Sequence, residues 1–350
     1  MKHWDKLLKW VGNATIVDIV CHTDTDGLTA AAQLALWLQK KKVGYNLILG
    51  SPERLRHANF WLRIKNDLVF FVDIPADHSE EELRKLNNRA NIVIIDHHKI
   101  EKDMNSKSII HYHREFLGEE KYYPSSKQVY DLFRGVDWMA CMGLIGDYGG
   151  EPWKKFINNI HKKYGFPQCK DDNCFDSPFA EYDQVINSAR MAIGDKGCRK
   201  AFNILINSRD WADFKNKASA LEGIAKQVND YIEHVKADFK HNKEVHGDLM
   251  FYELNNPKYR IGSALSTIIS TELPRKTIIL LIRKSGKVNI NLRRQDGEHD
   301  MSKLAKECAE SVGGSGGGHQ EAAGATIKES GLKEFKECVI KKLNEQAGSA

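Results

Sequence analysis

Mostly apolar segments of strand length alternate with helical segments over the first 110 residues, and this alternation constrains the fold more than any other feature. The strand-like segments are residues 14–21, 45–50, 67–74 and 91–95. Residues 28–42, between the first two, are rich in Ala and Leu. Residues 79–89, between the last two, begin with Ser79 and Glu82 at the spacing of a capping box. Because apolar strands separated by helices are typical of a parallel sheet buried on both faces, the pattern predicts an α/β domain.

The rest of the chain divides by composition. Residues 125–208 have a helical pattern with a polar loop near residues 166–178, and residues 209–243 resemble one long, charged helix of the kind that joins domains. Beyond it, we expect strands at 248–254, 277–284 and 287–294, and helices near 260–270, 301–311 and 331–345. We therefore predict a catalytic domain over residues 1–208, a helical linker over 209–244 and a smaller α/β domain over 245–350.

Bulk composition narrows the class of protein. The formal net charge of +5 permits a polyanionic substrate but does not by itself indicate nucleic acid. We expect no membrane segment, since no apolar run is long enough, and the first residues lack the pattern of a secretory signal. Seven scattered cysteines favour a reducing, cytoplasmic location over a disulfide framework. Cys169 and Cys174 lack the second pair that a zinc site needs, so we expect a plain loop there.

Acidic residues and histidines follow the predicted strands at the points where they end. In a doubly wound sheet, ligands bind beyond the carboxyl ends of the strands. Each motif alone is weak, because such residues also occur in solvated turns, but together they favour a common site. The residues concerned are His22, Asp24 and Asp26 after the first strand, Asp73 after the third, Asp96, His97 and His98 after the fourth, and Asp147 at the end of a helical run.

So many carboxylates in one place would repel one another and take up protons, unless divalent cations neutralise them. Oxygen and nitrogen donors without thiolates favour Mn²⁺, or alternatively Mg²⁺, over a structural zinc site. The candidate ligands outnumber those that one ion takes, which favours two ions about 3.5–4 Å apart. Asp96 is expected to orient an imidazole by hydrogen bonding without itself binding the metal. The candidate metal ligands are His22, Asp24, Asp26, Asp73, His97 and Asp147.

A glycine-rich segment at residues 312–325 suggests a second binding feature. Its glycines are expected to be too many for a helix or a strand, and their N–H groups can form an anion-binding nest. We expect residues 321–325 to begin a helix facing the same anion, and we favour this over a flexible linker. Arg293, at the end of a predicted strand, can add a planar fork for phosphate, while Arg294 should face the opposite side. The predicted substrate-binding residues are Arg293, Gly316, Gly317, Gly318 and His319.

The motifs HTDTDG, VDIP, IIDHH, GDYG and GGGH, in this order, make the chain resemble the DHH phosphoesterase superfamily. The similarity is to the branch with a C-terminal DHH-associated domain, which includes RecJ-like nucleases and nanoRNases. It implies a parallel-sheet domain joined by a long helix to a smaller α/β domain, with the active site in the cleft between them. It also implies two manganese ions on the six candidate ligands, with Asp73 as the bridge, and a substrate phosphate held by Arg293, Gly317, Gly318 and His319. His22 replaces the Asp of bacterial RecJ, so the chain looks more like compact archaeal and short-oligonucleotide members.

The resemblance implies a manganese-dependent exonuclease on single-stranded DNA or RNA, or on short oligonucleotides, which uses a metal-activated water. His98 and Asp96 would be catalytic, with His98 contacting the scissile phosphate. Trp61, Tyr112 and Tyr259 are candidates for stacking bases. Two alternatives stay open. One is a phosphoesterase acting on nucleotide bisphosphates, cyclic dinucleotides or polyphosphate, and the other is a catalytically silent scaffold with a replication or repair protein as its partner.

Overall fold

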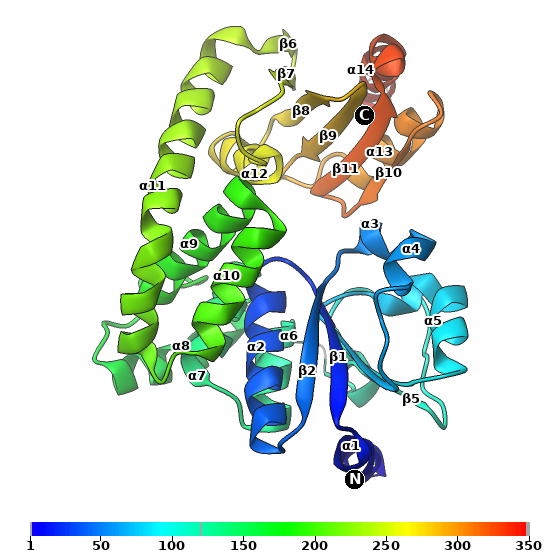
Figure 1. The fold of residues 1–350 in the computed structure, drawn as a ribbon. Helices are drawn as coiled ribbons and strands as arrows, with labels where there is room; N and C mark the ends of the chain where they lie inside the picture. Colours follow the sequence, from blue (N-terminus) through cyan, green and yellow to red (C-terminus); the bar gives the residue numbers. More distant parts are fainter. Residues whose placement is uncertain (1, 120, 348–350) are drawn as a thin grey trace. The chain divides into compact units, whose positions relative to one another are not determined.

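The protein forms two compact units, residues 1–225 and 226–350. The computed structural model describes residues 2–119 and 121–347. The predicted long helix is present as α11 (Trp211–Asn242; Figure 1). The division between the two units falls inside it. The predicted domain boundaries at residues 208 and 245 remain a proposal. The predicted location of the active site in a cleft between the domains also remains a proposal.

A five-stranded, fully parallel sheet forms the centre of the first unit, as the alternating pattern predicts. The strand order is β2-β1-β3-β4-β5, so the chain moves to opposite sides of β1 for β2 and β3. In such sheets, ligands bind where the strand order reverses. The strands are β1 (Ile16–Cys21), β2 (Gly44–Leu49), β3 (Leu68–Val72), β4 (Asn91–Ile95) and β5 (Ile109–Tyr112), the last of which was not expected.

Helices cover both faces of this sheet. Val17 and Ile19 of β1 pack into the cluster that contains α2 and the later helices, whereas Val20 packs with Leu55 and Trp61 on the other face. This alternation explains why the strands are apolar throughout. The helices are α1 (Lys2–Asn13), α2 (Thr25–Lys40), α3 (Pro52–Leu55), α4 (Ala58–Trp61), α5 (Glu80–Asn87), α6 (Ser125–Phe133), α7 (Asp137–Gly146), α8 (Gly150–Tyr164), α9 (Pro178–Ile193) and α10 (Asp195–Ile206), with 3₁₀ turns η1 (Ala76–Ser79) and η2 (Arg114–Leu117).

The second unit contains a mixed, six-stranded sheet in the order β10-β11-β9-β8-β7-β6. Within this sheet, only the β7–β8 pair is parallel among the strand pairs of the described residues. Phe251, Leu281 and Leu292 of the sheet pack with Phe335 of α14 in a separate core. The elements are β6 (Glu244–His246), β7 (Leu249–Asn255), α12 (Gly262–Glu272), β8 (Thr277–Lys284), β9 (Lys287–Arg293), α13 (Met301–Glu310), β10 (Ser315–Gly318), β11 (Ala322–Lys328), η3 (Glu329–Gly331) and α14 (Leu332–Ala347).

The prediction for the glycine-rich segment is wrong in two respects. The glycines form strand β10, and the expected helix over residues 321–325 is instead part of strand β11, antiparallel to β10. A Cβ on Gly316 would lie 2.4 Å from the carbonyl oxygen of Ala305 in α13. Glycine therefore lets this strand approach the helix backbone, a tertiary requirement that local propensity does not reveal.

Three smaller expectations are also wrong. The Ser79 side chain makes no capping hydrogen bond, because Ser79 ends the 3₁₀ turn η1 that leads into α5. Trp61 and Tyr259 are buried in the structure, so neither can stack on a base, whereas Tyr112 is half-buried.

Four cysteines are paired, contrary to the expectation of free thiols. Cys169–Cys174 and Cys308–Cys338 have Cα atoms 5.0 and 5.7 Å apart, within the range for disulfides, while three buried cysteines are free. The second pair joins α13 to α14, which the chain separation of the two cysteines does not predict.

No helix in the described part of the chain is both long and apolar enough to cross a bilayer. The cytoplasmic location stays a prediction.

Candidate metal centre

The loop after β1 places the first group of candidate ligands. Asp24 is the N-cap of α2, where its Oδ1 accepts a hydrogen bond from the Gly27 N–H at 3.0 Å. This cap puts Asp26 in the first turn of the helix and His22 just before it. A Cβ on Gly27 would lie 2.7 Å from the carbonyl oxygen of His22, so the tight fold of the loop requires glycine.

Asp73 lies at the centre of the group. It follows β3 with φ of +58°, a left-handed conformation that costs free energy for a non-glycine residue and is often associated with functional sites. Its carboxylate is buried, with Oδ2 3.7 Å from His22 Nδ1 and Oδ1 3.1 Å from His97 Nε2. Oδ1 also accepts a hydrogen bond from Ser125 Oγ at 3.1 Å. One carboxylate therefore contacts imidazoles from the ends of two other strands.

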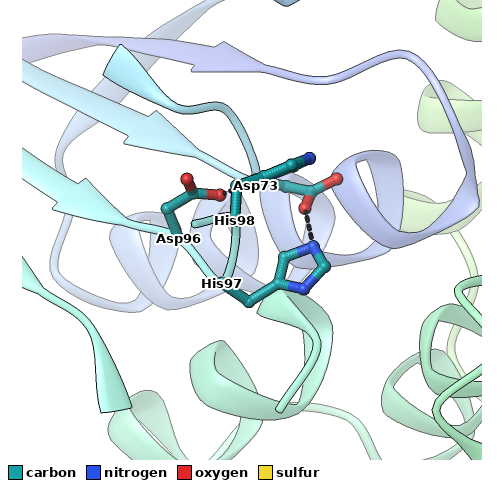
Figure 2. A group of neighbouring side chains, drawn as sticks. All are labelled: Asp73, Asp96, His97 and His98. Carbon is teal, nitrogen blue, oxygen red and sulfur yellow. Dashed lines mark hydrogen bonds and ion pairs between the residues drawn. The ribbon is translucent and has the colours of Figure 1, made fainter. Parts of the chain in front are cut away.

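The two histidines after β4 have different partners (Figure 2). The His97 ring is turned toward Asp73, whereas His98 Nδ1 lies 2.8 Å from Asp96 Oδ1. Burial alone would lower the pKa of His98, but the negative charge and hydrogen bond of Asp96 outweigh it and raise the pKa to about 9. Because Asp96 holds Nδ1, Nε2 is the ring nitrogen that can face a substrate. Asp96 thus orients an imidazole, as the sequence predicts.

Two further carboxylates complete the group. Asp147 is the C-cap of α7, and its Oδ2 lies 3.3 Å from His97 Nε2 and accepts a hydrogen bond from Tyr122 Oη at 2.6 Å. Asp26 accepts hydrogen bonds from the backbone N–H groups of Ser125 (2.7 Å) and Ser126 (3.0 Å) at the start of α6. The donors Tyr122, Ser125 and Ser126 thus hold both carboxylates in place, and none of these donors belongs to the strand-end motifs.

All eight predicted residues of this unit come together in one place. Their side-chain donor atoms form three overlapping groups in which every atom lies within 4.8 Å of the others. Asp73 and His97 each belong to two groups, so the groups share their centre. The groups are Asp73 with Asp96, His97 and His98; His22 with Asp24 and Asp73; and Asp26 with His97 and Asp147.

The electrostatics of this cluster fit divalent cations. Burial, followed by the charges of neighbouring carboxylates, raises the pKa of Asp73 well above its ordinary value. Burial likewise raises the pKa of Asp147 to about 6. His22 Nδ1 is buried and 2.5 Å from Asp24 Oδ2, yet the contact lacks hydrogen-bond geometry. A close but poorly directed nitrogen–oxygen contact, together with mutually repelling oxygens, is what a shared cation relieves.

Sequence reasoning missed several residues that support the cluster. Ser125 and Ser126 bind the carboxylates of Asp73 and Asp26, and Tyr122 binds Asp147. The sequence Pro-Ser-Ser at 124–126 indicates a helix start, but nothing local shows that this start meets the strand ends.

Asp183 of α9 was also missed. Burial raises the pKa of its carboxyl to about 7, and its Oδ1 accepts a hydrogen bond from Asn187 at 2.7 Å. The same oxygen lies 2.4 Å from where a Cβ on Gly146 would be. Asp183 therefore packs directly behind the residue that precedes the predicted ligand Asp147, and no strand-end rule points to a helical residue in this position.

The predicted substrate-binding residues gather in the second unit. Arg293 is paired in register with Ala322 of β11, whose carbonyl accepts the His319 N–H at 2.8 Å. The Arg293 guanidinium donates to the carbonyl of Ala323 at 3.1 Å and to Ser263 Oγ at 3.1 Å. The three glycines lie on β10, and His319 is exposed in the turn that follows. Arg293 and this turn are therefore neighbours.

Arg294 has a different environment from Arg293. It is buried, and its guanidinium bonds Thr277 and Asp296. The two adjacent arginines thus face opposite sides of the sheet edge, as strand geometry requires.

Two domain-family models match the chain. The DHH family N-terminal domain matches residues 16–144, and the DHHA1 domain matches residues 249–345. No curated protein sequence is similar enough to count as a match.

Several solved structures have the same fold. RecJ from Thermus thermophilus in complex with Mn²⁺ is 16% identical with a TM-score of 0.71, over 98% of this chain and 54% of that one. An exonuclease RecJ bound to manganese is 17% identical with a TM-score of 0.72, over 97% and 93% of the two chains. CDC45 from Entamoeba histolytica is 11% identical with a TM-score of 0.64, over 97% and 98%. This chain thus spans about half the length of the Thermus protein, and the likeness at these identities is one of fold.

The motif order, the parallel sheet with its strand-end acids and histidines, and the two domain matches all agree. The chain belongs to the DHH phosphoesterase superfamily, in the branch that carries a C-terminal DHHA1 domain.

Proposed function

We propose that this protein is a manganese-dependent phosphodiesterase that removes nucleotides from single-stranded DNA or RNA, or from short oligonucleotides. The observation that carries the proposal is the convergence of eight acidic and imidazole groups around Asp73. Two similar folds belong to RecJ proteins solved with Mn²⁺, and another to a RecJ solved with Mg²⁺, which supports a divalent cation and a nuclease.

We propose that six residues bind two cations, with Asp73 at the centre of the ligand set. Cations bound there would neutralise phosphate charge and lower the pKa of water, so that a nucleophile forms near neutral pH. The backbone N–H groups at the start of α6 hold Asp26, and the Tyr122 hydroxyl holds Asp147, so neither carboxylate needs to reorganise. The proposed ligands are His22, Asp24, Asp26, Asp73, His97 and Asp147.

His98 is the proposed proton-bearing group. With a pKa of about 9 it is protonated at neutral pH, and it can donate a hydrogen bond from Nε2 to a phosphate or leaving-group oxygen. Asp96 keeps the ring in place through Nδ1. His98 can therefore place its imidazolium N–H where the transferring phosphate gains negative charge, while Asp96 stabilises the protonated ring.

The second unit is proposed to bind a substrate phosphate. Arg293 offers a planar donor set, and His319 lies in the adjacent exposed turn. β10 is an edge strand in the described sheet, and an edge strand presents backbone N–H groups on its unpaired side. Gly317 would let a phosphate approach that backbone, because no atom lies within 4 Å of where its Cβ would be, and Gly316 and Gly318 remain proposed contacts on either side of it.

Hydrolysis of end-labelled single strands tests the proposal. DNA and RNA oligonucleotides of several lengths are incubated with manganese, with magnesium or with EDTA, using wild type and Asp147→Ala. We expect shortened products from wild type with manganese and none from the variant, since loss of one ligand disrupts the metal centre. The same reactions include a nucleotide bisphosphate, a cyclic dinucleotide and polyphosphate.

The alternatives make different predictions in this assay. Hydrolysis of the small molecules with intact oligonucleotides would establish a small-molecule phosphoesterase instead. Intact substrates throughout, with tight binding to a replication or repair protein, would establish a silent scaffold.

A further inference from the structure

Three arginine side chains gather at the carboxyl end of β2, which is an edge strand of the parallel sheet. Arg54 and Arg63 each donate through Nη1 to the carbonyl oxygen of Leu49, at 3.0 and 3.4 Å. Arg199 donates through both Nη atoms to the carbonyl oxygen of Leu47 at 3.3 Å. Desolvation, and then the charges of Arg54 and Arg199, lower the pKa of Arg63, so the three cations repel one another. An additional anion would relieve this repulsion.

Asp195 offsets part of the charge through a bidentate ion pair with Arg54, with nitrogen–oxygen distances of 2.7 and 3.0 Å. A guanidinium has five N–H donors, and the contacts to carbonyl oxygens use one donor of Arg63 and two of Arg199. Arg63 and Arg199 are also exposed, so their outer edges face water. They have the geometry to bind phosphate oxygens from solvent.

The positive surface continues from Arg199 into a hollow between α10 and the first turns of α11. The hollow has a volume of about 610 Å³, and none of the described residues that line it is acidic. Lys200 Nζ donates to the carbonyl oxygen of Ala220 at 3.2 Å, and Lys217 is held by Asp213 at 2.9 Å, so both ammonium groups stay at its wall. Its charged and amide lining residues are Lys196, Arg199, Lys200, Asn203, Asn207 and Lys217.

We call the six cationic residues of these two regions the basic track: Arg54, Arg63, Lys196, Arg199, Lys200 and Lys217. One end of the track adjoins the candidate metal centre. Cys198, the residue before Arg199, lies with its Sγ 3.4 Å from the carbonyl oxygen of Thr23, which is between His22 and Asp24. Gly50, just after β2, donates its N–H to the carbonyl oxygen of Cys21 at 2.8 Å. The loop that bears the first ligands is thus in direct contact, at Cys21 and Thr23, with the segments that carry the track.

We propose that the basic track binds successive phosphates of a nucleic-acid strand whose terminal phosphodiester lies at the metal centre. The inference rests on the proposed function and narrows its substrate class to strands of several nucleotides. A row of cations that leads away from a phosphodiesterase centre matches a ligand whose charges repeat along a chain. Asn203 and Asn207, which line the same hollow, can bind sugar or base edges. An acidic protein is the alternative ligand for such a surface. It would require the positive charge, but it would not require the track to begin at the metal centre.

The test measures binding without hydrolysis. A fluorescent single-stranded oligonucleotide, long enough to leave the metal centre and cross the hollow, is titrated by anisotropy in EDTA at several salt concentrations. The variant is Lys196→Gln/Arg199→Gln/Lys200→Gln, and the matched control, Lys9→Gln/Lys40→Gln/Lys42→Gln, removes the same charge from exposed positions on α1 and at the end of α2. Thermal melting with and without manganese checks that both variants fold and keep the metal centre.

We expect the track variant to weaken binding by about tenfold or more, and to reduce the slope of log affinity against log salt by about 2, because three phosphate contacts are lost. The control should stay within about twofold of wild type. Equal binding by wild type and track variant would overturn the inference, as would an equal loss in the control. Displacement of the strand by poly-aspartate as readily as by unlabelled strand would also overturn it, since the surface would then be unselective.

A separate experiment distinguishes failure of the basic-track proposal from failure of the proposed phosphodiesterase function. Wild type is incubated with manganese and a labelled dinucleotide, which is too short to occupy the track. Hydrolysis there with unaltered strand binding by the track variant would support the proposed function and refute the track. Track-dependent binding without any hydrolysis of dinucleotide or strand would support the track and refute the phosphodiesterase.

Discussion

Asp147→Asn should make the metal-free protein more stable while removing its response to manganese. Burial raises the pKa of Asp147 from an ordinary 3.8 to about 6, so the folded protein disfavours the ionised carboxylate. A protonated carboxyl is stabilising below pH 3.8, and this contribution is lost as the pH rises through 6. Asparagine never ionises and can still accept the Tyr122 hydrogen bond through its amide oxygen.

The magnitude follows from the shift in pKa. Ionising a group whose pKa rises from 3.8 to about 6 costs the folded state about 3 kcal/mol at pH 8. The Asp147 side chain is 27% exposed, and solvent screening reduces this cost to about 2 kcal/mol. For a unit of this size, that gain corresponds to a rise in Tm of about 4–8 °C. The advantage of asparagine should shrink as the pH falls from 8 toward 4.

Manganese should stabilise wild type but have little effect on the Asp147→Asn variant. A ligand present at about 100 times its Kd stabilises the folded state by about 2.7 kcal/mol. Wild type should gain stability of this order at pH 8, and less at pH 5 because protons then compete for the ligand oxygens. Asp147→Asn should gain little at either pH, since it lacks the ligand carboxylate.

Differential scanning calorimetry of both proteins, in EDTA and in manganese at pH 5 and pH 8, measures the eight Tm values that these expectations compare. The reasoning is refuted if asparagine lowers Tm in EDTA at pH 8, because Asp147 would then be a stabilising carboxylate. It is equally refuted if manganese stabilises the variant as much as wild type.

Three further predictions concern other residues. Gly27→Ala should destabilise the first unit by about 1–3 kcal/mol and weaken the manganese-dependent rise in Tm, because its Cβ would lie 2.7 Å from a carbonyl oxygen of the ligand loop. Gly12→Ala is the matched control, with no atom within 4 Å of its added Cβ, and an equal loss there would contradict the argument. Asp96→Asn should move the alkaline limb of kcat/KM from about pH 9 toward 6.5, since Asp96 raises the pKa of His98; an unmoved limb would show that His98 is not the titrating acid. Arg293→Gln should raise KM about tenfold with kcat retained, or lower kcat/KM if the contact tightens in the transition state, and unchanged kinetics would exclude a phosphate contact.

Local sequence patterns predicted much of the architecture because they report local preferences. Apolar runs of strand length gave the parallel sheet, and helical periodicity gave α2, α11 and the helices of the second unit. The strand-end rule selected eight polar residues of the first unit, and the structure brings all of them together. This worked because parallel strands share one carboxyl edge, so position along each strand is enough to predict proximity.

The tertiary structure decided the features that depend on partners far apart in the chain. Asp26 is held by the backbone of Ser125, 99 residues away, and no local pattern encodes that contact. The glycines of β10 form a strand because α13 approaches their backbone, although their local composition argued against one. The basic track likewise joins residues of α3, α10 and α11 with the segment after α4. Sequence alone thus determined which segments are strands and helices and which chemistry they carry to the sheet edge, whereas long-range packing determined what surrounds that chemistry.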